Sequence, residues 1–177
     1  SLWAQADSWE VHPNFLANPF DGDMAVVYLD HKPPFDPLPL FRNRLDSTWT
    51  NQLATLVGWG ANRALSEDTS YNEGFGIKRT GRAPILGTPT LADYDAAPED
   101  VPFLTSAVRG RNVKLNGRAP NANLCSGDSG GPLLVRLQDG SWRDIGITST
   151  IVPDHLTPEC GPPENWNDYS RVRRQMI

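Results

Sequence analysis

The sequence lacks the features that mark membrane and nucleic-acid-binding proteins. Its longest apolar runs, such as residues 53–57, fall far short of the roughly 20 residues that a membrane-spanning helix needs. Its 16 Lys and Arg residues are scattered, and the formal net charge is −5, so no basic patch gathers to attract phosphates or anionic lipid. We therefore expect neither a nucleic-acid partner nor a membrane partner.

Cysteine and histidine are also scarce. The only cysteines are Cys125 and Cys160, which leave a disulfide and two free thiols both open on count alone. The three histidines are His12, His31 and His155. No cofactor and no metal site is predicted. No charged start followed by an apolar run opens the sequence, so we expect any secretion signal to have lain upstream.

Length and composition favour one main core built from strands. A chain of 177 residues suits one ordinary domain better than two. Only 38% of the residues are apolar, and 16 prolines with 15 glycines suit many short strands joined by turns better than long helices. The expected fold class is all-β.

The most informative stretch is CSGDSGGPLL, residues 125–134. Glycines beside Ser129 leave room for a substrate carbonyl, and successive backbone N–H groups there can converge on an anion. The pattern CSGDSGGPL resembles the nucleophile loop of the trypsin-like (chymotrypsin-fold) serine proteases. The resemblance implies that Ser129 is the nucleophile and that the N–H groups of Gly127 and Ser129 form the oxyanion hole.

The same resemblance implies a two-barrel fold. The chain would hold the end of the first β-barrel with a linker in residues 1–45 and most of the second barrel in residues 46–177. Residues 48–60 resemble the first strand of the second barrel, and residues 169–177 resemble the last strand and the beginning of a terminal helix. Residues 83–91 and 107–115 are further strand candidates, whereas residues 62–84 are polar and carry no clear signal.

Asp23 is the expected triad aspartate. It stands at the start of a short apolar run, residues 24–29, which the pattern predicts as a buried strand. In the family this aspartate opens such a strand shortly after a segment resembling VHPNF, and residues 11–15 read VHPNF here. Asp21 is the alternative.

Gly127, Ser129 and Gly131 also satisfy the GxSxG pattern of α/β-hydrolases, in which a helix follows the serine. Pro132 and the hairpin expected from residues 132–136 and 142–151 argue against that fold. A strand should therefore follow Ser129.

No histidine matches the catalytic one of the family, whose segment is absent ahead of Asp23. We hold three hypotheses: a serine endopeptidase that acts through an acyl-enzyme, with its catalytic histidine on a separate N-terminal chain; a protease-like binding module without turnover; and an unrelated hydrolase that uses His155. The first requires two partners, the N-terminal chain and a polypeptide substrate.

The resemblance implies three further features. Cys125 and Cys160 form a disulfide, which would suit a secreted protein. Asn123 lies at the base of the substrate pocket, with Ser149 and Ile151 on its wall. Because asparagine brings no negative charge, cleavage after Arg or Lys is not expected. Ser149 also has a family counterpart that bonds near the triad aspartate.

Overall fold

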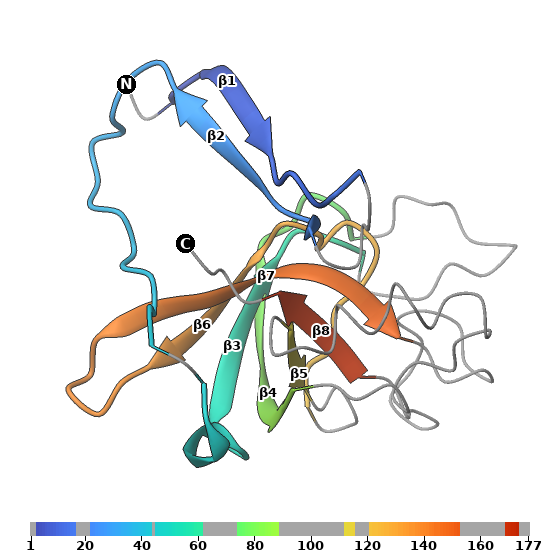
Figure 1. Ribbon diagram of the computed structural model, residues 1–177. Helices are drawn as coiled ribbons and strands as arrows, with labels where there is room; N and C mark the ends of the chain where they lie inside the picture. Colours follow the sequence, from blue (N-terminus) through green and yellow to red (C-terminus); the bar gives the residue numbers. More distant parts are fainter. Residues whose placement is uncertain are drawn as a thin grey trace, which may run out of the picture.

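The computed structural model describes residues 3–16, 22–43, 45–61, 74–88, 112–115, 121–152 and 169–173. Within these residues the chain forms eight β-strands and one short 3-10 turn. Two strands make a small antiparallel sheet, and six close into a barrel (Figure 1). The all-β fold class is confirmed, and the barrel is consistent with the chymotrypsin-like fold.

The barrel is an antiparallel sheet closed on itself. Its strands are β3 (Leu53–Gly58), β4 (Arg79–Gly87), β5 (Asn112–Leu115), β6 (Pro132–Arg136), β7 (Trp142–Val152) and β8 (Tyr169–Arg173). Around the barrel they follow the order β3-β4-β5-β8-β7-β6, and β6 pairs back with β3 through Thr55 and Leu134. Closure leaves no strand edge unpaired.

Alternating side chains fill the barrel, as expected for strands with one face inside. Ala54 and Leu56 of β3 point inward, as do Leu133 and Val135 of β6. Within the part of the chain that the structure describes, the main cluster of buried apolar residues is Ala54, Leu56, Ala83, Ile85, Val113, Leu115, Leu124, Leu133, Val135 and Ile145. Leu124 immediately precedes the CSGDSGGP stretch, so one end of that stretch is anchored in the core.

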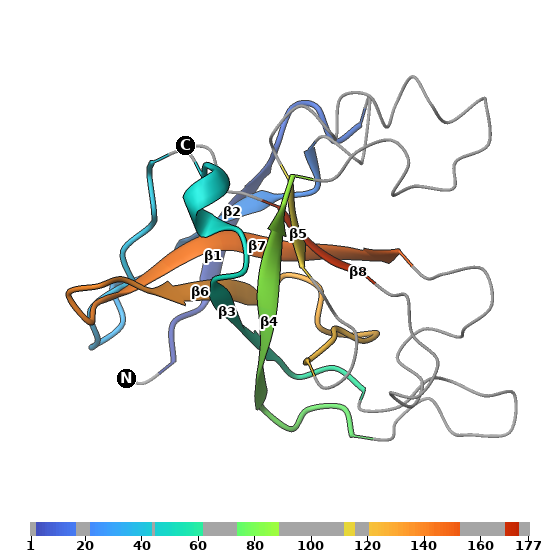
Figure 2. The same cartoon turned by 90° about the horizontal axis from the view of Figure 1, so that it is seen from below.

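The small sheet pairs β1 (Ala6–Val11) with β2 (Ala25–Leu29) and lies apart from the barrel strands in Figure 1, whereas in the view from below it overlaps β6 and β7 (Figure 2). Every residue of both strands is exposed, including Trp9 at 70% and Val26 at 54%. The strand prediction is correct, but the prediction that residues 24–29 are buried is wrong for this chain, because no described residue covers either face. The domain division at residue 45 stays a prediction.

The connection between the two sheets binds the barrel at β7. Phe41 N–H donates to the Asp144 carbonyl at 2.8 Å, and Asp144 N–H donates to the Pro39 carbonyl at 3.0 Å. The 3-10 turn η1 (Ser47–Trp49) follows, capped by Asp46, whose carboxylate accepts from Thr48 N–H at 2.9 Å. These contacts lead the chain directly into β3.

The sequence predicted most of the strands correctly, but it did not predict where β4 begins. β6 has the predicted bounds, and β3, β5, β7 and β8 lie within or close to the predicted ranges. β4 begins at Arg79, inside the segment without a clear signal, because Arg79, Thr80 and Arg82 break the apolar alternation that marks a strand. The suggested terminal helix falls in residues 174–177, outside the described part of the chain.

The Asp144→Asn substitution should stabilise the protein at neutral pH. Burial raises the pKa of Asp144, and the hydrogen bond from Gly146 N–H offsets only part of that rise. The folded protein therefore binds a proton at Asp144 more tightly than the unfolded chain does, and stability falls as pH rises through the raised pKa. Asparagine keeps an acceptor oxygen for Gly146 and removes the charge.

We expect a gain of no more than about 1 kcal/mol in the free energy of unfolding at pH 7, because the group is only half-buried. Urea unfolding of both proteins between pH 3 and pH 8 measures it. The gain should vanish below the ordinary carboxyl pKa of about 4. Equal stabilities at pH 7 would contradict the prediction.

Candidate active site

The CSGDSGGP stretch forms a loop held at both ends. On the amino side, Leu124 and Cys125 are buried at 2% and 7% exposure, and on the carboxyl side Leu133 of β6 is fully buried. Between these anchors, Gly127 and Gly130 have positive φ angles of 89° and 81°, a conformation that favours glycine. We call residues 125–131 the nucleophile loop.

The Asp128 carboxylate binds the segment after β3 with one oxygen and the start of its own loop with the other. Oδ1 accepts from Gly60 N–H at 2.7 Å, and Oδ2 accepts from Cys125 N–H at 2.8 Å. Hydrogen bonds to a charged acceptor are among the stronger ones in proteins. The loop is thus fastened to the chain segment that follows β3.

This fastening requires glycine at two positions after β3. A Cβ atom on Gly58 would lie 1.9 Å from Asp128 Oδ1, and one on Gly60 would lie 2.7 Å from the same oxygen. In the sequence, the Gly58-Trp59-Gly60 segment stands out only as the end of residues 48–60, which resemble a strand. Its contact with the nucleophile loop was missed.

The loop leaves two N–H groups without an internal acceptor. Gly130 N–H donates to the Thr148 carbonyl at 2.9 Å, and Gly131 N–H donates to the Asp128 carbonyl at 3.0 Å. Neither Gly127 N–H nor Ser129 N–H has a hydrogen-bond acceptor within the described part of the chain. These are the two groups expected to bind an oxyanion, and Ser129 between them is exposed. Their function stays a prediction.

Asp23 reaches the barrel through Ser149. The Ser149 hydroxyl donates to Asp23 Oδ2 at 2.5 Å, across 126 positions of sequence. The preceding residue, Thr148, exchanges backbone hydrogen bonds with Gly130 and Gly131 of the nucleophile loop. The structure therefore brings Asp23 and the loop of Ser129 to the same stretch of β7, and the bond expected of Ser149 is present.

The described histidines are engaged elsewhere. His12 Nδ1 accepts from Asn14 N–H at 3.2 Å, and His31 Nδ1 lies 2.7 Å from Asp30 Oδ1. A hydrogen bond from Gln5 N–H lowers the pKa of Asp30, and His31 lowers it further. Among the described residues, no hydrogen bond or ion pair joins His12 or His31 to Asp23 or Ser129.

Of the other predicted site residues, the structure describes Asn123 and the backbone of Ile151. Asn123 is half-buried, and its carboxamide oxygen accepts from Leu124 N–H at 2.9 Å. Ile151 lies in β7, two positions after Ser149. Asp21, His155 and Cys160 lie outside the described residues. The α/β-hydrolase fold is excluded, because the strand β6 follows Ser129 where that fold needs a helix.

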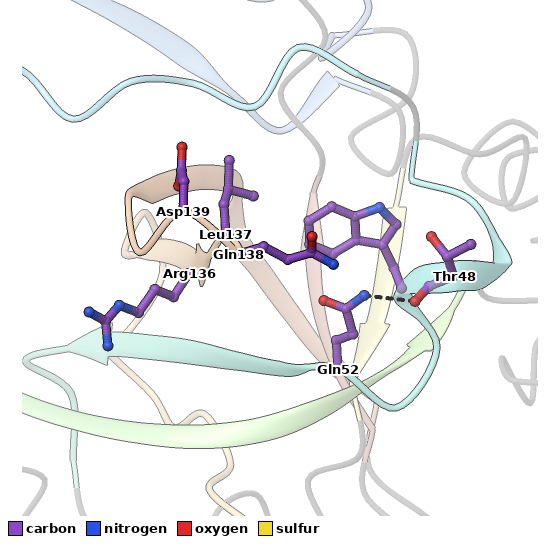
Figure 3. A pocket seen from close by; sticks show the side chains of 7 residues that line it. Thr48, Gln52, Arg136, Leu137, Gln138 and Asp139 are labelled. Atoms are coloured by element: carbon purple, nitrogen blue, oxygen red, sulfur yellow. Dashed lines mark hydrogen bonds between the residues drawn. The ribbon is translucent and has the colours of Figure 1, made fainter.

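A cavity of about 460 Å³ lies at the far end of β6, next to η1 (Figure 3). Figure 3 shows Gln52 turned toward Thr48, whose carbonyl accepts its amide hydrogen bond at 2.7 Å. The lining residues are Thr48, Trp49, Gln52, Arg136, Leu137, Gln138 and Asp139. None of them belongs to the predicted site, so this cavity is separate from the nucleophile loop.

Comparison with known proteins gives related sequences at low identity. No protein-family model matches the chain. Mouse vitamin K-dependent protein C is 26% identical over 94% of this chain and 36% of its own length. The serine protease filzig of Drosophila melanogaster is 27% identical over 78% of this chain and 8% of its length.

The chain resembles trypsin-like serine proteases over most of its length. The resemblance drawn from CSGDSGGPL is therefore confirmed. Another relative, glucanase inhibitor protein 1 of Phytophthora sojae, is 24% identical over 91% of this chain and 53% of its own length. The chain spans about a third of protein C and about half of the glucanase inhibitor, so the activity of a whole protein remains to be proposed.

The Gly127→Ala substitution should destabilise the protein more than Gly130→Ala. Both positions have positive φ, so each alanine carries a cost of about 1 kcal/mol from backbone conformation. A Cβ on Gly127 would also lie 2.4 Å from Cε1 of Phe75, whereas nothing lies within 4 Å of one on Gly130.

We expect Gly127→Ala to cost about 1–3 kcal/mol more than Gly130→Ala in urea unfolding, the range seen for overpacking. Adding Phe75→Ala to Gly127→Ala should recover part of the difference. Equal costs for the two alanines would show that Phe75 does not fill the space beside Gly127.

Proposed function

We propose that this chain is the nucleophile-bearing part of a serine endopeptidase, which hydrolyses peptide bonds through an acyl-enzyme on Ser129. The observation that carries the proposal is the hydrogen bond from Ser149 to Asp23, on the same stretch of β7 that binds the nucleophile loop. Near this stretch lie an aspartate, an exposed serine and two N–H groups that have no acceptor among the described residues. A histidine is the remaining requirement, and an N-terminal chain of the same protein would supply it.

In the proposed reaction, Ser129 Oγ attacks the carbonyl carbon while its proton passes to the imidazole of the partner's histidine. Asp23 holds that imidazole in the correct tautomer. The negative oxygen formed on the substrate accepts hydrogen bonds from Gly127 N–H and Ser129 N–H. Collapse breaks the C–N bond, and the leaving amine takes the proton from the imidazolium. Water then attacks the acyl-enzyme by the same route in reverse.

The exposed hairpin of β1 and β2 supports the proposal that an N-terminal chain binds here. β1 and β2 present Trp9, Val26, Val27 and Tyr28 to solvent at 46–70% exposure, an apolar surface that a folded protein normally covers. Unpaired strand edges there can also accept further strands. An N-terminal chain that completes the first barrel would cover this surface and place its histidine beside Asp23.

A non-catalytic binding module is the second candidate. It is favoured by the relative named as a glucanase inhibitor, which covers 91% of this chain. It also requires no histidine, in keeping with the placement of His12 and His31 in the described part of the chain. Both candidates share the fold and differ only in whether Ser129 reacts.

We further propose that Cys125 and Cys160 form a disulfide and that the protein is secreted. Cys125 is buried at the start of the nucleophile loop, and the described residues contain no free cysteine. A link between residues 125 and 160 would close a loop and restrict the unfolded chain by roughly 3–4 kcal/mol. Such a bond persists in oxidising compartments.

The whole protein, with its N-terminal chain, should react at Ser129 with a fluorophosphonate probe. This chain alone should react far more slowly, because removing a triad member costs on the order of 10⁴ to 10⁶ in turnover. Peptide mass mapping locates the label. The Ser129→Ala protein is the control for labelling elsewhere.

If the intact two-part protein leaves Ser129 unlabelled over hours while a competent serine protease reacts, the enzyme proposal fails and the binding module takes its place. A non-reducing peptide map of the same sample tests the disulfide. Recovery of both Cys125 and Cys160 as alkylatable thiols would refute it.

The active protein should prefer small, uncharged side chains at the cleaved bond. By resemblance Asn123 lies at the base of the pocket and supplies no charge to balance a buried cation. Ile151 on the wall would narrow the entrance. Peptide substrates with alanine, arginine or lysine before the cleaved bond measure the preference, and faster turnover of the arginyl and lysyl substrates would overturn this assignment.

A further inference from the structure

Residues 74–79 form a turn that is fixed by one arginine. Nη1 of Arg79 lies within hydrogen-bond distance of three carbonyl oxygens: 2.6 Å from Gly74, 3.1 Å from Gly60 and 3.3 Å from Ile77. Two of these carbonyls belong to the turn, and the third belongs to the segment after β3. We call residues 74–79 the arginine-bound turn.

A second bond fastens the turn to the same segment. Gly76 N–H donates to the Trp59 carbonyl at 2.8 Å. Gly74 and Gly76 have φ angles of 83° and 78°, so the backbone reverses on either side of Phe75 in a way that favours glycine. These constraints determine where the Phe75 side chain projects.

Phe75 packs against the nucleophile loop. A Cβ on Gly127 would lie 2.4 Å from Cε1 and 2.9 Å from Cδ1 of the Phe75 ring, and 3.1 Å from the Cα atom of Gly60. Gly127 therefore lies between an aromatic ring and the segment after β3. Its N–H is one of the two groups proposed to bind the oxyanion.

Gly60 forms hydrogen bonds both with the arginine-bound turn and with the nucleophile loop. Its carbonyl accepts from Arg79, and its N–H donates to Asp128 Oδ1 at 2.7 Å. The next residue, Ala61, donates its N–H to the Ser126 carbonyl at 2.9 Å. Movement of the arginine-bound turn would thus release Gly127 on the side of Phe75 and loosen the segment that holds Asp128.

We propose that Arg79 and Phe75 are positioning residues that hold the Gly127 N–H in place for the oxyanion. This inference rests on the proposed function. Arg79 touches neither Asp23 nor Ser129 and acts through Gly60 and Phe75. Arginine suits the position because its guanidinium is permanently charged and offers several fixed donors to backbone carbonyls.

The test uses the whole protein with its N-terminal chain and the fluorophosphonate probe. Arg79→Met should lower the maximal labelling rate at Ser129 about 10-fold, less than the 10²–10³ seen when an oxyanion donor is removed outright. The probe concentration at half-maximal rate should change by less than about twofold, because Gly127 N–H acts on the charged state and not on initial binding.

Conservative variants separate positioning from general damage. Arg79→Lys keeps the charge without the planar fork and should recover part of the rate. Phe75→Leu should also lower the maximal labelling rate, although it leaves Arg79 unchanged. Arg82→Met is the matched control, because Arg82 lies on the same strand, is exposed and has no side-chain partner in the described residues. It should react like the unchanged protein.

A second measurement does not depend on reactivity. Amide hydrogen exchange of the peptide that covers residues 124–132 should quicken in Arg79→Met and Phe75→Leu, since Asp128, Gly130 and Gly131 N–H are protected in the intact loop. It should be unchanged in Arg82→Met. This measurement also applies if Arg79→Met folds poorly, because Phe75→Leu tests the same contact.

The outcomes separate the two proposals. If the unchanged protein is not labelled, the proposed function fails, and the exchange data still decide whether Arg79 and Phe75 hold the loop. If the unchanged protein is labelled and both variants match Arg82→Met in rate and in exchange, the positioning inference is overturned. A change confined to the half-maximal concentration would also overturn it, because it would assign the turn to substrate binding.

Discussion

The nucleophile loop depends on one partly buried carboxylate. Asp128 accepts hydrogen bonds from Gly60 and Cys125, and these two contacts join the end of β3 to the start of the loop. In the loop that Asp128 holds, the N–H groups of Gly127 and Ser129 have no hydrogen-bond acceptor among the described residues. The glycines at 58, 60 and 127 follow from this arrangement, because Cβ atoms there would collide with Asp128 or Phe75.

The second constraint is that the two sheets differ in how far they bury their apolar side chains. The barrel encloses a buried apolar core, whereas every residue of β1 and β2 is exposed. Within the described residues, only the Ser149–Asp23 bond is a hydrogen bond from a side chain of the barrel to the hairpin region. A hairpin of this composition is marginal by itself. We interpret the exposed hairpin as one part of a site whose other part is supplied by a partner.

The sequence predicted this architecture unevenly. Ser129 and its glycines were singled out because CSGDSGGP is a long, specific motif, and Asp23 was singled out by resemblance, from its place between the VHPNF segment and an apolar strand. The beginning of β4, Phe75 and Arg79 were missed, because the polar segment around them has no periodicity and their contacts with residues 60 and 127 are distant in sequence. Burial of residues 24–29 was predicted wrongly, since a strand pattern records an apolar face and not whether the same chain covers it.

The central claim is that Gly127 N–H and Ser129 N–H converge beside the Ser129 hydroxyl. The most direct measurement is a crystal structure of the whole protein after reaction with a peptidyl phosphonate. We expect phosphorus bonded to Ser129 Oγ and a phosphoryl oxygen about 2.7–3.1 Å from both nitrogen atoms. A phosphoryl oxygen that contacts neither N–H, or a Gly127 N–H turned into the protein, would contradict the account.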